Sequence, residues 1–210
     1  MAVGREINVV LSPLLETVRL ESDIDLSSFE TIVFSSANGV KALAENRPAT
    51  GAVAYCVGDQ TAAAAAAVGY RTISANGSAR DLAELVAKLW SGEKMVYACG
   101  RSTAFDLAGF LAARCVPIEV AVLYDQKPLK INTEAKIAAS EESCLFPVYS
   151  ARTGRILARE VRSISDNSHV VACMSESIAE EVSPLRWKSV VAGRPDAESL
   201  METIIRWHLI

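Results

Sequence analysis

The feature that most constrains the fold is a regular alternation between short apolar runs and segments with helical periodicity. A short apolar run bounded by turn residues suits a buried strand, and apolar residues three and four apart suit a helix that covers a sheet. The helical spacing is clearest at Leu82, Leu85, Val86 and Leu89. Alternating strands and helices predict parallel sheets connected by right-handed crossovers, which is an α/β fold.

The strands expected in the first half are residues 7–12, 31–34, 53–57, 71–73, 94–98 and 118–124, and the helices are 40–45, 60–68, 79–89 and 104–113. In the second half, strands 145–149, 169–173 and 188–192 alternate with helices 153–161, 176–182 and 197–207. Gly69 falls where a left-handed helix end is expected. The strand at 7–12 has only six residues before it, so its domain is expected to be small or the chain to start late.

Parts of the first half match parts of the second half. Residues 33–37 align with 147–151, residues 74–82 align with 192–200, and 60–62 fall opposite 176–178. We interpret this as two similar α/β domains; the alternative is that any two strand–helix units look alike. The polar, proline-containing stretch 126–132 is the best candidate for a linker.

Composition excludes several classes of protein. With 210 residues and 50% hydrophobic content, the chain suits one large domain or two of about 100 residues. A net charge of −4 and 6% aromatic residues argue against nucleic-acid binding. Two histidines cannot build a His-rich metal site, and five dispersed cysteines without a CxxC pair are expected to be buried, reduced thiols. No signal peptide and no run of about 20 apolar residues is apparent, so we expect a cytoplasmic protein without membrane partners.

Candidate ligand contacts lie at the strand ends. In an open parallel sheet, ligands bind beyond the carboxyl ends of the strands, where helix N-termini direct N–H groups outward. Four such ends carry small or hydroxyl residues: Ser35–Ser36, 57–61, Ser150–Ala151 and Ser175–Ser177. They suit an anionic ligand, especially a polycarboxylate, although helix N-capping is the alternative at each one. Because they fall at equivalent positions of two domains, we expect them to share a cleft.

Few other side chains suggest chemistry. Arg101, Arg152 and Arg155 follow strand ends and could clamp carboxylates, or could simply lie on solvated helix faces. Tyr124 closes an apolar strand and could donate a phenolic proton, or could be a half-buried packing residue. No dinucleotide, P-loop or nucleophile-elbow motif is present. Any chemistry is therefore expected to rely on positioning and hydrogen bonds, without a cofactor or metal.

Several segments resemble motifs of the uroporphyrinogen-III synthase family. Residues 32–40 (IVFSSANGV) resemble the family's IFTSANGV segment, and residues 57–62 followed by Gly69–Tyr70 resemble its VGxxTAxxxxxxGF segment. The later landmarks are Gly77–Leu82, Val122–Tyr124, Ser150, 175–179, and Pro195–Asp196 with Leu200. The resemblance extends from about Val9 to the C-terminus. Each motif is degenerate, so the resemblance rests on the order and spacing of the motifs together.

The resemblance implies two parallel-sheet α/β domains joined by a two-stranded ladder, with the substrate in the cleft between them. One domain would be discontinuous, residues 1–17 plus 129–210, and 18–128 would be the inserted domain. Residues 14–20 and 120–126 would form the ladder. The family begins with a strand, an Arg-Pro pair and a helix before the segment that matches Val9–Leu15. This chain lacks them, so the first domain is expected to miss a strand and a carboxylate-binding arginine.

The resemblance also implies a reaction, that of a cyclising hydro-lyase in haem biosynthesis. Hydroxymethylbilane, a linear tetrapyrrole with eight carboxylates, would lose water and close with its last ring inverted, giving uroporphyrinogen III. The expected course is loss of hydroxide to an azafulvene, attack to a spirocyclic pyrrolenine, then fragmentation and reclosure. Tyr124 would assist the leaving hydroxyl as an acid. The substrate-binding residues would be Ser35, Ser36, Ala37, Gly58, Thr61, Arg101, Ser150, Ala151, Ser175 and Ser177.

Some features leave other readings open. Glu176 places an acid where the family usually has small residues, which should weaken binding of a polyanion somewhat. We expect a monomer. The alternatives to a synthase are a non-catalytic two-domain binder of a small anion, a truncated inactive paralogue, and a plain α/β interaction domain.

Overall fold

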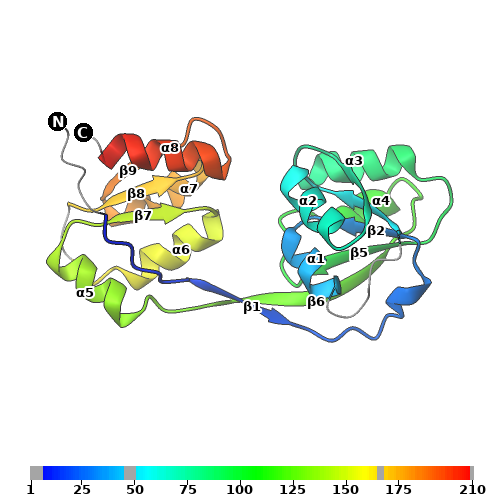
Figure 1. Cartoon of the computed structure of the whole chain (residues 1–210), viewed down its shortest axis with the longest axis horizontal. Helices are drawn as coiled ribbons and strands as arrows, with labels where there is room; N and C mark the ends of the chain where they lie inside the picture. Colours follow the sequence, from blue (N-terminus) through cyan, green and yellow to red (C-terminus); the bar gives the residue numbers. More distant parts are fainter. Residues whose placement is uncertain (1–6, 45–50, 165–167, 209–210) are drawn as a thin grey trace. The chain divides into compact units, whose positions relative to one another are not determined.

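The computed structural model describes residues 7–44, 51–164 and 168–208. The chain divides into two compact units, each with its own sheet (Figure 1). Unit 1 comprises Met1–Glu16 and Pro128–Ile210, and unit 2 comprises Thr17–Lys127. The chain therefore passes from unit 1 into unit 2 and returns, so that unit 2 is inserted in unit 1.

Unit 2 is built on a six-stranded sheet in the order β1-β6-β5-β2-β3-β4. Its strands are β1 (Leu15–Arg19), β2 (Thr31–Phe34), β3 (Val53–Cys56), β4 (Arg71–Ser74), β5 (Met95–Gly100) and β6 (Glu119–Pro128). Neighbouring strands from β6 to β4 are parallel. Hydrogen bonds from Leu20 N to Leu123 O (2.8 Å) and from Leu129 N to Leu14 O (2.9 Å) show that β1 runs antiparallel to β6.

Helices cover both faces of this sheet. They are α1 (Ala37–Ala44), α2 (Asp59–Ala67), α3 (Ala79–Leu89) and α4 (Leu107–Ala112), with a 3-10 turn, η1, at Leu26–Ser28. Side chains of α1 and α2 share one core with the strands, and side chains of α3 and α4 share the other. This two-sided covering explains why β2 and β5 are buried along their whole length and read as continuous apolar runs.

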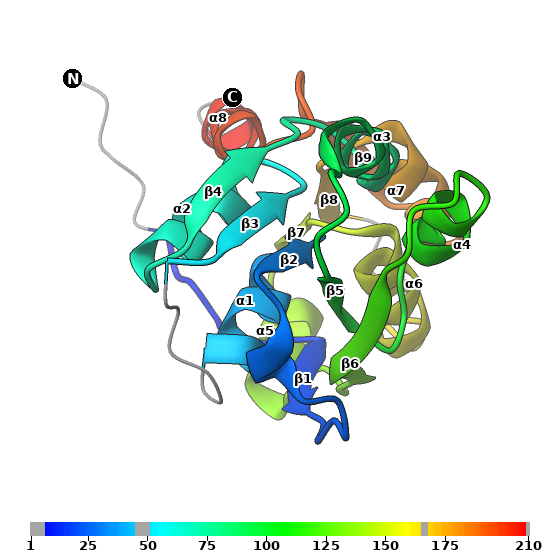
Figure 2. The same cartoon turned by 90° about the vertical axis from the view of Figure 1, so that its right-hand side faces the viewer.

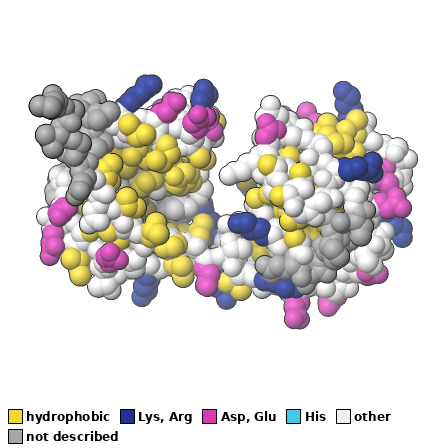
Figure 3. Space-filling model, viewed as in Figure 1, with side chains coloured by type: hydrophobic (Ala, Val, Ile, Leu, Met, Phe, Trp, Pro, Cys, Tyr) yellow, Lys and Arg dark blue, Asp and Glu magenta, His cyan; other side chains and the backbone are white. Residues whose placement is uncertain are grey.

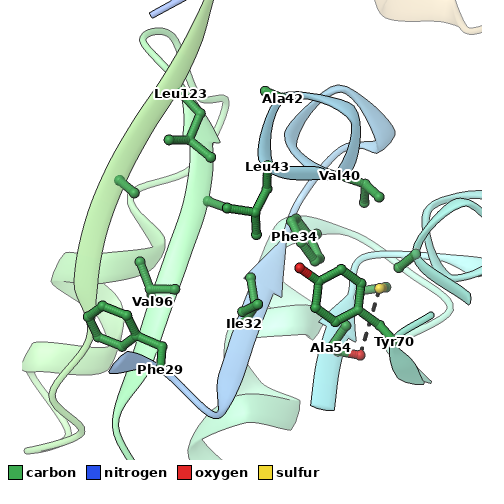
Figure 4. Close-up of a cluster of buried hydrophobic side chains, with 14 of the residues drawn as sticks. Phe29, Ile32, Phe34, Val40, Ala42, Leu43, Ala54, Tyr70, Val96 and Leu123 are labelled. Carbon is green, nitrogen blue, oxygen red and sulfur yellow. Dashed lines mark hydrogen bonds between the residues drawn. The ribbon is translucent and has the colours of Figure 1, made fainter. Parts of the chain in front are cut away.

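The core under α1 and α2 positions the strand ends (Figure 4). Phe34, at the end of β2, is completely buried, and its ring meets Tyr70 edge-on with centroids 5.7 Å apart. Gly39 lets α1 lie directly on the sheet, because a Cβ there would stand 2.6 Å from the carbonyl oxygen of Ala98. The turn from β2 into α1 is thereby held tightly against β5.

Unit 1 has a three-stranded parallel sheet in the order β7-β8-β9. Its elements are α5 (Thr133–Glu141), β7 (Leu145–Val148), α6 (Ala151–Glu160), β8 (Val170–Cys173), α7 (Glu176–Val182), η2 (Ser183–Leu185), β9 (Lys188–Val191) and α8 (Ala197–His208). In the rotated view, α6 and α7 lie on one side of these strands and α8 on the other (Figure 2). Pro147 is in β7, an edge strand, where a missing N–H costs no ladder hydrogen bond.

The predicted α/β class is confirmed, and the two units share an order of elements. The run β2-α1-β3-α2-β4-α3 of unit 2 has the same sequence of elements as β7-α6-β8-α7-β9-α8 of unit 1. In both runs three consecutive strands lie side by side and parallel. The helices predicted at 79–89 and 176–182 begin and end as expected. Of the helix predicted at 40–45, Glu45 lies outside the described residues.

One expectation about secondary structure is wrong, and one helix is absent from the expectations. Residues 7–12 do not form a strand. They instead contact the start of α5, where the side-chain amide of Asn132 donates to the Leu11 carbonyl (2.9 Å) and the backbone N–H of Asn132 donates to Ser12 Oγ (3.0 Å). Helix α5 itself was missed, because its apolar residues show little helical periodicity. The available signal was its cap, since Asn132 Oδ1 accepts from Ala135 N at 2.8 Å.

The units differ in how much apolar surface they expose. Figure 3 shows hydrophobic side chains gathered on one face of the unit that holds β7–β9. The exposed large hydrophobic residues are Ile7, Val9, Leu11, Ile137, Tyr149, Met201 and Ile205 in unit 1, against Val68, Ile73, Leu89 and Val120 in unit 2. The wider sheet of unit 2 therefore encloses its apolar residues more completely.

Three further properties concern the described residues only. No helix among them combines the length and hydrophobicity needed to cross a membrane. No group of three or more His, Cys, Asp or Glu side chains in these ranges could hold a metal ion. All five cysteines are free thiols; Cys56, Cys99 and Cys173 are buried as expected, Cys144 is half-buried, and Cys115 is exposed, contrary to the prediction.

Candidate functional site

The carboxyl edge of the unit 2 sheet brings several of the predicted residues together. Because β2 lies between β3 and β5, the residues that follow these parallel strands are neighbours along one edge. Those residues are Ser35 and Ser36 after β2, Gly58 after β3 and Arg101 after β5. Ala37 and Thr61 are in the first turns of the helices that begin there, so all six lie at the same edge.

Tyr124 also lies at this edge, against the backbone of β5. An irregularity between Cys99 and Gly100 places Gly100 opposite Tyr124. A Cβ at Gly100 would stand 2.6 Å from Cε2 of the Tyr124 ring, so only glycine leaves room for the ring. Arg101 N donates to the Tyr124 carbonyl at 2.9 Å, which fixes the strand locally. The position of the phenol is therefore set by close packing and strand pairing.

The environment of Tyr124 favours its protonated form. The side chain is 8% exposed. Burial raises the pKa of its phenol, while hydrogen bonds with the Ser36 side chain and the Gly100 backbone act in the opposite direction. Tyr124 is thus more deeply buried than the half-buried packing residue that was the alternative. A neutral phenol in contact with a serine hydroxyl can donate a proton to a ligand at this edge.

A second phenol–serine pair was not anticipated. Tyr97 in β5 and Ser35 share a hydrogen bond of 2.7 Å between their hydroxyl oxygens. Burial raises the pKa of Tyr97 to about 12. Val33 pairs with Tyr97 in the register, and Ser35 follows Val33 on the same face of the sheet. Only this register reveals the pair, which is why sequence reasoning did not find Tyr97.

The helix N-termini at this edge are not equivalent. Ser36 caps α1, since its Oγ accepts from Asn38 N at 3.1 Å. Helix α2 starts after Gly58, which has no side chain to cap it. Thr61, in the first turn of α2, is buried. The first N–H groups of α2 are thus available to an anion, although Asp59 adds a negative charge beside them.

Arg101 is already paired. Its Nε lies 3.3 Å from Oδ2 of Asp125, and its side chain is largely exposed. An exposed ion pair of this kind is weak and can exchange partners. Arg101 can therefore reach a ligand carboxylate only in competition with Asp125.

In unit 1, the predicted serines follow two neighbouring strands. Ser150 caps α6, accepting from Thr153 N at 3.1 Å, and its hydroxyl lies 2.7 Å from Thr153 Oγ1. Ser175 Oγ lies 3.0 Å from Ser177 Oγ and makes no cap hydrogen bond to α7. Because β7 and β8 are adjacent, Ser150 and Ser175 lie at one edge, with Ala151 at the start of α6.

The predicted residues thus form two sets, each at the carboxyl edge of its own sheet. The unit 2 set contains Tyr124, Ser35, Ser36, Ala37, Gly58, Thr61 and Arg101, and the unit 1 set contains Ser150, Ala151, Ser175 and Ser177. Of the two arginines considered beside them, Arg152 and Arg155, the second is paired with Glu181. Both sets offer hydroxyl and backbone N–H donors to acid groups, and only the unit 2 set adds a buried phenol, that of Tyr124.

Comparison with known proteins identifies a matching family and similar solved structures. A family model described as "Uroporphyrinogen-III synthase HemD" matches residues 3–202. The structure of uroporphyrinogen-III synthetase from Helicobacter pylori is similar, with a TM-score of 0.71 and 17% identity over 92% of this chain and 91% of that one. A mutant uroporphyrinogen III synthase from Thermus thermophilus gives a TM-score of 0.54 and 14% identity over 95% and 88%. A search of curated proteins found no significant match. At these identities the structures establish the shared fold, and the family match establishes the kinship.

Proposed function

The chain belongs to the uroporphyrinogen-III synthase family, and from this premise we propose that it converts hydroxymethylbilane into uroporphyrinogen III and water. The observation that carries the proposal is the match of the family model to residues 3–202. The buried Tyr124, in contact with Ser36 at a sheet edge rich in hydroxyl groups, supports it. We further propose that the protein acts in the cytoplasm as a monomer and needs no cofactor, since a pyrrole nitrogen of the substrate itself can expel the hydroxyl group.

In the proposed mechanism, Tyr124 acts as the acid. Its phenol gives a proton to the departing hydroxyl group, which leaves as water while electrons from the pyrrole nitrogen form the azafulvene. The substituted carbon of the last ring then attacks, giving the spirocyclic pyrrolenine, which fragments and recloses with that ring inverted. The proton released when the final pyrrole becomes aromatic returns to the phenolate. A raised pKa suits this role, because the phenol stays protonated between turnovers.

The remaining residues of the two sets bind the acid arms in this proposal. Ser35, Ser36, Thr61 and the N–H groups at Ala37 and Gly58 would hold arms in unit 2, with Arg101 as a further donor. Ser150, Ser175, Ser177 and the N–H of Ala151 would hold others in unit 1. Spontaneous closure attacks the free position of the last ring and gives the symmetric isomer. Catalysis therefore consists largely of holding the substrate in the orientation that favours the substituted carbon.

The test is an isomer analysis. The full chain is supplied with hydroxymethylbilane generated in place, and the oxidised products are separated into the type I and type III uroporphyrins. A catalyst gives type III faster than the uncatalysed rate of closure. Product that contains only the symmetric isomer would refute the synthase and favour the non-catalytic anion binder, for which retention of the tetrapyrrole without turnover is the expected result.

A further inference from the structure

A cavity of about 200 Å³ opens at the carboxyl edge of unit 2, on the side of the sheet that α3 and α4 cover. Its walls include Tyr97, Arg101, Thr103 and Phe105. Pockets that enclose whole cofactor-sized ligands are larger, about 300–1,000 Å³. This cavity therefore has room for one acid arm of a tetrapyrrole and not for the whole molecule.

Arg80 stands beside a wall of this cavity. It lies in the first turn of α3, which follows β4, and Phe105 lies in the loop that follows β5, so both are at the same sheet edge. The guanidinium carbon of Arg80 is 5.2 Å from the centre of the Phe105 ring and 5.8 Å from that of Phe110. The two rings are themselves in contact, with centroids 5.6 Å apart. Cation–π contacts with both rings hold the guanidinium in place.

Arg80 differs from three other arginines near strand ends in forming no ion pair with a residue that the structure describes. Arg101, Arg155 and Arg194 form ion pairs with Asp125, Glu181 and Asp196, whereas no such pair involves Arg80 within the part of the chain that the structure describes. The adjacent carboxylate of Asp81 accepts from Ser78 N (2.6 Å) and Ser78 Oγ (2.7 Å) in a capping box. The two rings position the guanidinium of Arg80, and its charge is the smallest of several causes that lower the pKa of the Asp81 carboxyl. Among the described residues, none accepts a hydrogen bond from the N–H donors of this guanidinium.

We propose that Arg80 binds one carboxylate arm of the substrate, which enters the cavity beside Phe105. This inference rests on the proposed function and adds a binding residue to it. A guanidinium donates two parallel hydrogen bonds to a carboxylate, and one already held by aromatic rings loses little freedom when it does so. The Thr103 hydroxyl at the cavity wall offers a further donor to the same arm.

The experiment compares Arg80→Gln with Arg114→Gln. Arg114 is the matched control, because its substitution removes the same charge and its guanidinium lies 3.6 Å above the ring of Phe110, which, unlike Phe105, does not line the cavity. We expect Arg80→Gln to raise the KM for hydroxymethylbilane by about tenfold with kcat within about twofold, and Arg114→Gln to change KM by less than about twofold. Arg80→Lys should recover part of the loss. An unchanged KM in Arg80→Gln, or an equal rise in both variants, would overturn the proposal.

A second measurement separates this inference from the proposed activity. Fluorescence anisotropy of uroporphyrin III, a stable molecule with the same eight acid arms, reports binding without turnover. We expect Arg80→Gln to weaken its binding by about the same factor as it raises KM. If the parent binds uroporphyrin III through Arg80 but forms only the symmetric isomer, the synthase fails and the arm-binding role of Arg80 stands. A parent that does not bind it, or a variant that binds it equally well, refutes the role of Arg80.

Discussion

The carboxyl edges of the two units have the same layout but different chemistry. In both, the first helix is capped by a serine (Ser36 and Ser150) and the second begins without a side-chain cap, at Gly58 and Ser175. The difference comes from β5 and β6, which extend the unit 2 sheet beyond β2. No described strand extends the unit 1 sheet beyond β7.

These two additional strands supply the buried phenols. Tyr97 and Tyr124 come from β5 and β6, and each contacts a serine that follows β2. At the corresponding edge of unit 1 the nearest phenol, Tyr149, is exposed. The repeated strand–helix units of both domains can thus supply hydrogen-bond donors for acid groups. A buried phenol that can give up a proton is supplied only by the additional strands of unit 2. Unit 2 is therefore where we expect the chemistry, and unit 1 is where we expect binding alone.

The largest expected effect is on turnover. Tyr124→Phe should lower kcat by about 100-fold, because positioned acids contribute at least that much, and should leave the free energy of unfolding nearly unchanged. Steady-state formation of type III uroporphyrinogen and urea denaturation measure the two quantities. The matched variant in unit 1, Tyr149→Phe, should leave kcat unchanged. Equal rates for Tyr124→Phe and the parent would reject Tyr124 as the acid.

The next effect concerns stability and distinguishes the first helices of the two units. Gly39→Ala should lower the free energy of unfolding by about 2 kcal/mol, since its Cβ would meet the Ala98 carbonyl oxygen at 2.6 Å. Gly154→Ala in α6 should change stability by less than about 1 kcal/mol, because its nearest contact is Val182 Cγ1 at 3.3 Å and alanine favours helix. Urea denaturation followed by circular dichroism measures both. Equal losses would show that α1 does not pack more closely than α6.

Alkaline pH should weaken unit 2 more than unit 1. Burial raises the pKa of Cys56 and Cys99 in unit 2, and of Cys173 in unit 1, to about 11 from an ordinary value near 9. The unfolded chain then loses these protons first, so stability is complete below pH 9 and falls between pH 9 and 11, by up to about 1 kcal/mol per pH unit for each thiol. Tyr97 adds a similar loss between pH 10 and 12.

Pulsed thiol labelling with mass spectrometry reads the two units separately. At pH 10, Cys56 and Cys99 should become reactive at a lower urea concentration than Cys173, and at pH 8 the difference should be smaller. Replacing Cys99 by alanine should reduce the pH dependence of unit 2. A difference between the thiols that is identical at the two pH values would contradict the role of burial.

The smallest effect tests the caps within unit 1. Ser150→Ala should lower the free energy of unfolding by about 1 kcal/mol, because it removes the hydrogen bond to Thr153 N. Ser175→Ala should cost less than about half as much, since Ser175 makes no cap hydrogen bond. Thermal denaturation compares them. If Ser175→Ala is the more damaging of the two, the distinction between capped and uncapped helices does not hold.

Much of this comparison could be predicted from sequence. Apolar runs marked the strands, and the serines after residues 34 and 148 marked the edges, because local periodicity and capping depend on neighbouring residues. The failures depend on contacts between distant residues. The Tyr97–Ser35 pair can be recognised only from the register of β2 on β5. Arg80 becomes a candidate binding residue only because the fold brings Phe105, from a different loop, against its guanidinium. The segment 7–12 has a strand-like composition, but none of the strands that the structure describes pairs with it.

The antiparallel pairing of β1 with β6 has a consequence for how the chain folds. Once unit 2 has formed, Leu20 and Leu123 are hydrogen-bonded neighbours, and Leu14 and Leu129 follow just beyond them. The N-terminal and C-terminal segments of unit 1 are then held next to each other where β1 pairs with β6, so the whole of unit 2 connects them as a short turn would. Because folding of unit 2 already covers the entropy cost of closing that long loop, unit 1 should assemble faster once unit 2 has formed.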